Sequence, residues 1–108
     1  MTISRVNYPE NHKYMTFTWD NNKNIHNVKK HGLPFTVART AFYDPDNVLL
    51  YDEIHSAIED QYILIGRLDT NIFVVSFTVA AHNKYSIISA RKAEKSETRV
   101  YYNHQRSL

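Results

Sequence analysis

The sequence contains no cysteine in its 108 residues. A disulfide framework, a thiolate zinc site and a cysteine nucleophile are therefore excluded. Gly32 and Gly66 are the only glycines, so the chain has neither a glycine-rich phosphate loop nor a Gly-x-Ser-x-Gly nucleophile elbow. No hydrophobic run approaches the roughly 20 residues of a membrane-spanning helix. The first residues also lack the hydrophobic core of a signal peptide. We therefore expect a soluble cytoplasmic domain with chemistry based on His, Glu, Lys and Arg.

Charge is distributed unevenly along the chain, although the formal net charge is only +2. Residues 1–39 carry six Lys/Arg and two Asp/Glu, and residues 71–108 carry the same numbers. Residues 40–70 carry seven acidic residues and one arginine. If the two basic ends meet in space, they form a positive surface suited to phosphate. The alternative is that these charges only cover solvated faces.

Hydrophobic periodicity predicts an α+β fold, with one curved antiparallel sheet and helices packed on it. Residues 1–13 are assigned as a lead-in, and residues 14–108 as one domain. Strands are predicted at 14–19, 48–52, 61–67, 72–79 and 84–90, and helices at 20–31, 35–43 and 93–102. Residues 53–60 fit either a loop or a single helical turn. The apolar run at 72–79 is the strongest strand and indicates a central position.

The first predicted helix has clear start and stop signals. Asp20 is an expected N-cap, and Gly32 followed by Pro34 ends the helix. Helical spacing places four polar side chains on one face, namely Lys23, Asn27, Lys30 and His31. Ile25, Val28 and Leu33 are left to face the core.

Three residues are candidates for chemistry on a phosphate. His31 suits a general acid or base, or it only interacts with the helix dipole. Arg91, where the last strand ends, suits a bidentate phosphate ligand, or else it pairs with the acidic middle of the chain. Glu97 either orients Arg91, serves as a base, or is a solvated partner of a nearby cation.

Other candidates are weaker. His55 and Glu59 lie four residues apart, but they lack the close ligand spacing of a metal site. The aromatic residues Trp19, Tyr62, Tyr101 and Tyr102 have faces on which RNA bases stack, although such residues usually lie in the core. Trp19 stays ambiguous because it adjoins the basic helix.

Three blocks of the sequence together resemble the BrnT family. The first block runs from Trp19-Asp20 through Lys30-His31-Gly32-Leu33 to Phe35, Ala38, Phe42 and Asp44. The second is His55-x-x-x-Glu59 followed by Gly66, and the third is Ile87-Ile88-Ser89-Ala90-Arg91-Lys92-Ala93 with Glu97 and Tyr101. The blocks follow the family's order from about Phe17 to Tyr102, which is nearly the whole chain.

The resemblance implies a bacterial toxin of a type II toxin–antitoxin pair, with a RelE-like fold and an endoribonuclease activity that blocks translation. It also implies a small DNA-binding antitoxin, BrnA, which covers the toxin and represses the shared operon. The chain would then form a hetero-oligomer with the antitoxin and reach operator DNA only through it.

Taken together, these observations predict metal-independent cleavage of RNA without a cofactor. The predicted catalytic residues are His31, Glu59, Arg91 and Glu97. The predicted RNA-binding residues are Trp19, Lys23, Lys30, Arg67, Lys84, Lys92 and Tyr101.

The chain departs from the BrnT pattern at two positions. Arginine is common in the family where this chain has Gln61, and also where it has Ser86 before the Ile-Ile-Ser block. Both changes remove cations from the sheet that should meet RNA. The alternatives are therefore a weaker nuclease, one that uses Lys84 and Arg67 instead, or a degenerate toxin that only binds its antitoxin or nucleic acid.

Overall fold

The computed structural model of the chain describes residues 14–106, so the predicted lead-in at 1–13 lies outside the described residues. The elements in order are β1 (Thr16–Thr18), α1 (Asn21–His31), α2 (Phe35–Ala38), the 3-10 helix η2 (Arg39–Tyr43), β2 (Val48–Tyr51), β3 (Gln61–Leu68), β4 (Asn71–Ala81), β5 (Lys84–Lys92) and α3 (Lys95–Arg106). The predicted strands and helices are confirmed, with shifted ends. Residues 53–60 form turns and bends, as the loop alternative predicted.

The described strands form one five-stranded sheet in the order β1-β5-β4-β3-β2. The α+β class and the central position of β4 are confirmed. The sheet is mixed, however, because β1 pairs with β5 in parallel while the other pairs are antiparallel. A parallel pairing depends on how α1 and α2 return the chain to the sheet, which local periodicity does not encode.

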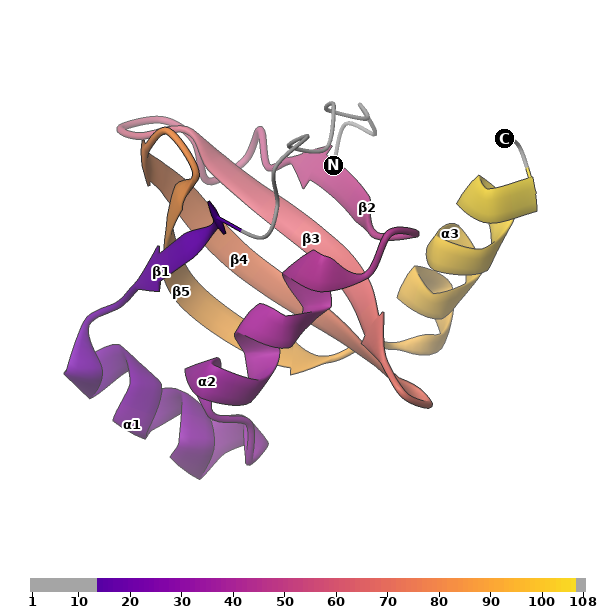
Figure 1. Cartoon of the computed structure of the whole chain (residues 1–108), viewed down its shortest axis with the longest axis horizontal. Coiled ribbons are helices and arrows are strands. Elements are labelled where there is room, and N and C mark those ends of the chain that lie inside the picture. Colours follow the sequence, from indigo (N-terminus) through magenta and orange to yellow (C-terminus); the bar gives the residue numbers. More distant parts are fainter. Residues whose placement is uncertain (1–13, 107–108) are drawn as a thin grey trace.

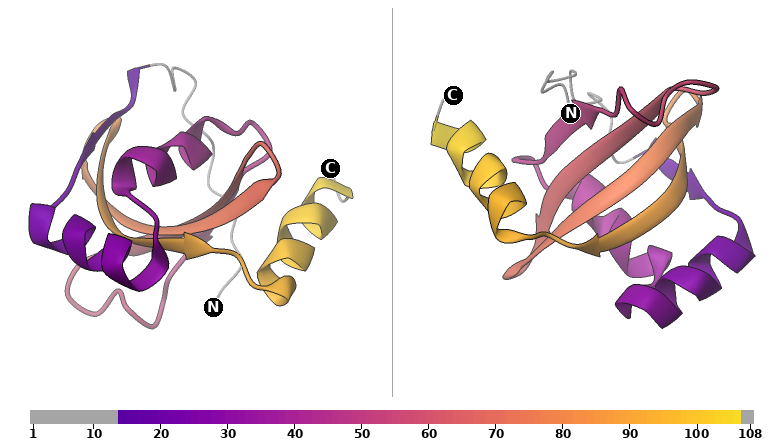
Figure 2. Two further views of the ribbon diagram at one scale, coloured as in Figure 1. Left: turned by 90° about the horizontal axis from the view of Figure 1, so that it is seen from below. Right: turned by 180° about the vertical axis from the view of Figure 1, so that it is seen from behind.

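The helices lie on both faces and at one edge of the curved sheet. Figure 2 shows α2 inside the curve, α3 outside it, and α1 beside the edge strand β5. β1 pairs only with the first residues of β5, so α1 covers the rest of that edge (Figure 1). No helix in the described part of the chain is long and apolar enough to cross a membrane.

The helix α1 has the predicted ends. Asp20 accepts a hydrogen bond from the Asn22 backbone N–H at 2.7 Å, and Gly32 adopts a left-handed conformation with φ of 66°. The predicted core face is wrong in part. Ile25 and Val28 are 46% and 39% exposed, whereas Asn27 is 4% exposed. Leu33 is buried as predicted.

The core on the concave face lies between α2–η2 and the sheet. Phe35, Ala38, Ala41 and Phe42 form the predicted apolar stripe, and all four are buried. Gly66 of β3 allows close approach of η2, because a Cβ at this position would lie 2.5 Å from the Ala41 carbonyl oxygen. The sheet and this helix therefore meet at backbone distance.

The core on the convex face lies under α3. Tyr101 is fully buried there among Val48, Leu50, Ile65 and Val74. Its hydroxyl donates to Asp44 Oδ2 at 2.6 Å. The prediction that Tyr101 contacts RNA is therefore wrong, because a 0% exposed ring has no face on which a base can stack.

We predict that Tyr101→Phe lowers the free energy of unfolding by about 1–3 kcal/mol, because a buried carboxylate oxygen loses a donor. Urea unfolding measures this change. Tyr102→Phe is the matched control, since Tyr102 is exposed, and it should stay within about 0.5 kcal/mol of wild type. Equal stability of Tyr101→Phe and wild type would contradict the prediction.

Candidate nucleic-acid interface

Arg91 and Glu97 form a bidentate ion pair at the end of β5. Arg91 Nη1 and Nη2 donate to the two carboxylate oxygens of Glu97, each at 2.7 Å. Glu97 lies in the first turn of α3, and its Oε1 also accepts from the Glu94 backbone N–H at 2.8 Å. The turn from β5 into α3 therefore brings the two side chains together, as one reading of the sequence predicted.

This pairing decides what each group can do. The Arg91 guanidinium lowers the pKa of the Glu97 carboxyl, which is therefore ionised at neutral pH. Both Glu97 oxygens are occupied, so this carboxylate mainly orients Arg91. Arg91 Nη1 also donates to the Lys92 carbonyl at 3.3 Å. The Nε–H group and one Nη2–H group are left for an anionic ligand.

A pocket of about 290 Å³ lies between α1 and β5. Three predicted site residues, Lys23, Lys30 and His31, line it together. The remaining lining residues are Asn22, His26, Asn27, Ile88 and Ser89. The structure thus brings the predicted cationic face of α1 against the edge strand that leads to Arg91.

Asn27 fixes α1 to this edge. Its Nδ2 donates to the carbonyls of Leu33 and Ala90, each at 2.8 Å, and its Oδ1 accepts from the Ala90 backbone N–H at 3.0 Å. Beyond β1, no strand among residues 14–106 pairs with the edge of β5, so this amide replaces one rung of the ladder. These hydrogen bonds are made at Ala90, the residue directly before Arg91.

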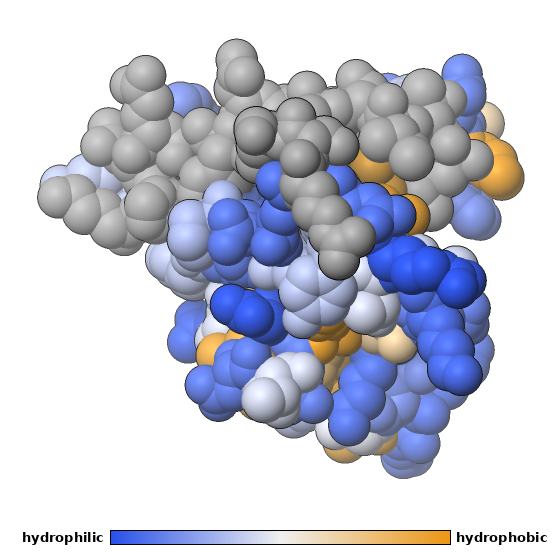
Figure 3. Space-filling view, turned by 90° about the vertical axis from the view of Figure 1, so that its right-hand side faces the viewer, coloured by the Kyte–Doolittle hydropathy of each residue, from blue (hydrophilic) through white to orange (hydrophobic). Residues whose placement is uncertain are grey.

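Trp19 and Arg67 have mainly internal partners. Trp19 is half-buried and packs edge-on against Phe35, with ring centroids 5.9 Å apart. Arg67 is exposed at the end of β3, and the neighbouring phenols of Tyr101 and Tyr102 raise the pKa of its guanidinium. Arg67 therefore lies beside α3. The described surface on the α3 side is mostly hydrophilic (Figure 3).

Glu59 and Lys84 lie at the other end of the sheet. Glu59 is exposed in the loop before β3, and Lys84 begins β5, whereas Arg91 and Lys92 end it. Figure 1 shows this loop at the end of the sheet where β3 begins, whereas α1 lies beside the edge of β5. A strand rise of about 3.3 Å per residue puts roughly 23 Å between Lys84 and Arg91 along β5. One phosphate cannot contact both Glu59 and Arg91.

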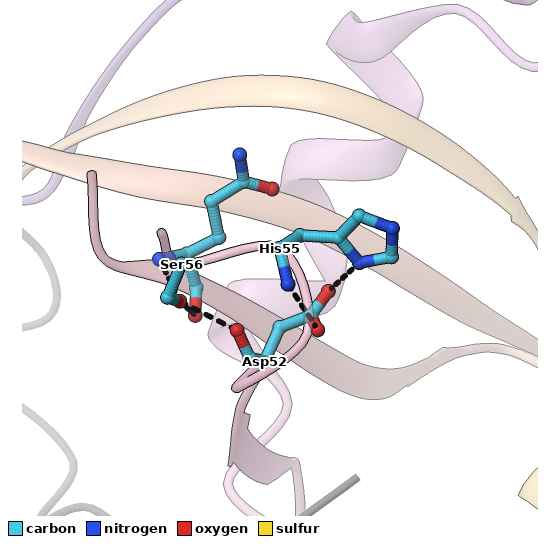
Figure 4. Close-up of polar contacts among 4 residues, drawn as sticks. Asp52, His55 and Ser56 are labelled. Carbon is cyan, nitrogen blue, oxygen red and sulfur yellow. Dashed lines mark hydrogen bonds and ion pairs between the residues drawn. The ribbon is translucent and has the colours of Figure 1, made fainter. Parts of the chain in front are cut away.

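The same loop contains Asp52, His55 and Ser56, whose contacts are drawn in Figure 4. His55 Nδ1 lies 2.8 Å from Asp52 Oδ2. The Ser56 hydroxyl donates to the Asp52 backbone carbonyl and accepts from the Gln61 N–H at 2.9 Å. The Ser56 hydroxyl is therefore not activated by the His55 imidazole. These hydrogen bonds instead hold the loop in one conformation. Within residues 14–106, no group of three His, Asp or Glu side chains is arranged to hold a metal ion.

The two departures from the BrnT pattern fall on one row of the sheet. Gln61 and Ser86 pair with Thr78 of β4 from either side. The neighbouring Tyr62, Phe77 and Tyr85 belong to the concave core, so alternation along the strands turns the three polar residues to the convex face. The missing cations would thus have flanked Thr78 on one face of the sheet.

Sequence reasoning missed Asn22, His26, Ile88 and Ser89 as parts of the pocket. Helical spacing was sufficient to find His26, which lies three residues after Lys23 and four before Lys30. Ile88 and Ser89 depend on a β-bulge, because Ser76 pairs with Ser89 but Phe77 pairs with Ile87. No local sequence signal places an extra residue there.

A family model described as the ribonuclease toxin BrnT of a type II toxin–antitoxin system matches residues 19–97. The chain belongs to the BrnT family. Its fold is similar to the crystal structure of the Brucella abortus ribonuclease toxin BrnT, with a TM-score of 0.58 and 26% sequence identity. That match covers 75% of this chain and 99% of the Brucella chain. A comparison with curated proteins finds no match.

The BrnT match includes all parts of the interface described above. It begins at Trp19, spans α1 and β5, and ends at Glu97. Membership confirms the resemblance that the three sequence blocks indicated, and a type II toxin family implies an antitoxin protein as partner.

We predict that Glu97→Gln lowers the free energy of unfolding by about 0.2–1 kcal/mol at pH 7, since the ion pair is partly exposed. The folded state lowers the pKa of Glu97, so this contribution is complete above the ordinary carboxyl pKa. It is lost as the pH falls through the lowered value. Urea unfolding at several pH values measures it. The control is Glu94→Gln, and a difference for Glu97→Gln that persists at the lowest pH would contradict the assignment.

Proposed function

We propose that the chain is an endoribonuclease toxin that cleaves RNA without a metal ion, inhibits translation in the cytoplasm and is neutralised by a BrnA-like antitoxin. The observation that carries the proposal is the Arg91–Glu97 pair beside a pocket with two lysines and two histidines, in a chain of the BrnT family. The antitoxin is also expected to connect the toxin to operator DNA.

The chemistry follows from RNA itself. The 2′-hydroxyl loses its proton to His31, and its oxygen bonds to the adjacent phosphorus. The P–O5′ bond breaks, the imidazolium returns the proton to the 5′-oxygen, and a 2′,3′-cyclic phosphate forms. His31 is preferred to Glu59 as the base because it shares the pocket with Lys23 and Lys30.

Charge stabilisation is assigned to Arg91. The phosphorane gains negative charge as the bond forms, and a guanidinium already oriented by Glu97 needs little rearrangement to meet that charge. Ser89 lines the pocket and Arg91 follows two residues later on the same side of β5, about 7 Å along the strand. Lys92, next to Arg91, adds a cation for a neighbouring phosphate.

Arg91→Ala should reduce RNA cleavage about 10²–10³-fold, the usual effect of removing one transition-state donor. The assay is cleavage of a labelled RNA by purified protein with excess EDTA. Arg99→Ala is the matched control, because Arg99 is an exposed arginine on α3. Intact RNA with wild-type protein, or full activity of Arg91→Ala, would contradict the proposal.

The cellular part of the proposal has its own test. Expression without an antitoxin should stop growth and the incorporation of labelled amino acids, and Arg91→Ala should relieve the arrest. Coexpression of the protein encoded by a neighbouring short reading frame should restore growth and copurify with the chain. Normal growth with abundant folded protein would favour the alternative below.

A binding-only protein is the second candidate, and Gln61 and Ser86 are the observation that favours it. A row of the sheet with arginines at these two positions would place two cations on the same face as Arg91. Without them, fewer phosphates are neutralised along this face, which weakens both RNA binding and transition-state stabilisation.

The double variant Gln61→Arg/Ser86→Arg distinguishes the two candidates. If this row contacts RNA, affinity should rise, and the slope of log K against log salt should steepen by about 1–2. Fluorescence anisotropy with a labelled RNA measures both quantities. Thr36→Arg/Thr70→Arg adds the same charge at exposed positions and is the control. Higher affinity without any cleavage would favour the binding-only protein, and no gain over the control would remove the row from the interface.

A further inference from the structure

The pocket between α1 and β5 has two kinds of wall. One wall consists of two rows of α1 side chains at four-residue spacing, Asn22-His26-Lys30 and Lys23-Asn27-His31. The other wall is the bulged part of β5, where Ile88 and Ser89 line the cavity. Cations and imidazoles therefore lie across the cavity from an apolar residue.

The size of the pocket limits what it can hold. Its volume of about 290 Å³ is close to the lower bound of roughly 300 Å³ for small-molecule sites. A single nucleotide fits this scale, whereas a stretch of RNA has to pass outside it. Ile88 and the imidazole of His26 suit a nucleobase, which RNA-binding proteins stack on apolar or aromatic groups.

The ammonium groups of Lys23 and Lys30 are suited to binding phosphate. Lys23 and Lys30 lie seven residues apart on α1, which places them about two helical turns, or roughly 10 Å, apart along the axis. Both side chains are exposed, so their ammonium groups can reach the phosphates on either side of one nucleotide. Because the two lysines are this far apart, the centre of the pocket between them is open to a nucleobase.

The pocket is also held in shape before any ligand binds. The three hydrogen bonds of the Asn27 side chain fix α1 to the backbone of Leu33 and Ala90. Asn27 itself is 4% exposed, so these bonds are shielded from water. A preorganised pocket loses less conformational entropy on binding.

We propose that this pocket binds one nucleotide of the RNA strand, with the base against Ile88 and the flanking phosphates on Lys23 and Lys30. The choice of RNA as the ligand rests on the proposed function. The pocket adds a base-reading subsite beside the phosphate that Arg91 contacts, so it determines which nucleotide precedes or follows the cleaved bond.

Binding is tested directly on the full chain, independently of cleavage. The probes are the four nucleoside 5′-monophosphates, inorganic phosphate, and a short RNA whose 2′-hydroxyls are methylated so that it cannot be cleaved. NMR titration follows the Ile88 methyl groups and the His26 and His31 rings. At least one mononucleotide should shift these signals at lower concentration than inorganic phosphate does, and the methylated RNA should displace it.

Two variants locate the ligand. Lys30→Ala should weaken mononucleotide binding about tenfold, the usual effect of losing one charge-assisted hydrogen bond. Lys29→Ala removes an equal charge from the same helix at a position that does not line the pocket, and it should change binding less than about twofold. Ile88→Trp should fill the pocket and weaken the mononucleotide far more than inorganic phosphate, with folding of each variant checked by thermal unfolding.

Three outcomes overturn the inference. Equal binding of phosphate and all mononucleotides shows a phosphate site without a base subsite. A mononucleotide that methylated RNA does not displace shows a site for free nucleotides. No shift of the pocket signals excludes a nucleotide here, even if RNA is cleaved. Conversely, nucleotide binding without cleavage supports the pocket and contradicts only the proposed nuclease.

Discussion

The carboxylate of Asp44 is the connection on which the arrangement of the layers depends. It accepts from the Tyr101 hydroxyl at 2.6 Å and from the Arg67 backbone N–H at 2.8 Å, and its residue is buried. Asp44 directly follows η2 on the concave face, whereas Tyr101 belongs to α3 on the convex face. One buried acceptor therefore joins both helical layers to β3, and α3 carries Glu97 to Arg91.

A second buried polar group, Asn27, has the corresponding role at the sheet edge. By bonding to Ala90 it aligns α1 with β5, so the cationic side chains of the helix face the strand that ends in Arg91. The helix consequently turns Ile25 and Val28 toward solvent. At this position, hydrogen bonding of the Ala90 backbone groups stabilises the fold more than burial of the Ile25 and Val28 side chains would.

Membership of the BrnT family and the geometry of the site answer different questions about this protein. The family gives the class of toxin and its type II antitoxin partner. The geometry separates groups that the sequence could not separate: His31 lines the pocket between α1 and β5, while Glu59 lies outside it, in the loop before β3. In the proposed ribonuclease the two groups would act on different phosphates of one RNA strand, because they cannot both serve chemistry at a single phosphate.

The sequence by itself determined the elements, the ends of α1, the apolar stripe of α2–η2 and the family, because caps, turns and periodicity are local. For Glu97 it offered three alternatives, one of which was that this carboxylate orients Arg91. Only the tertiary structure decided that β1 pairs in parallel, that Asn27 is buried and that Tyr101 is inaccessible. These features depend on which backbone groups lack partners once the layers have met, and residue spacing along the chain carries no record of that.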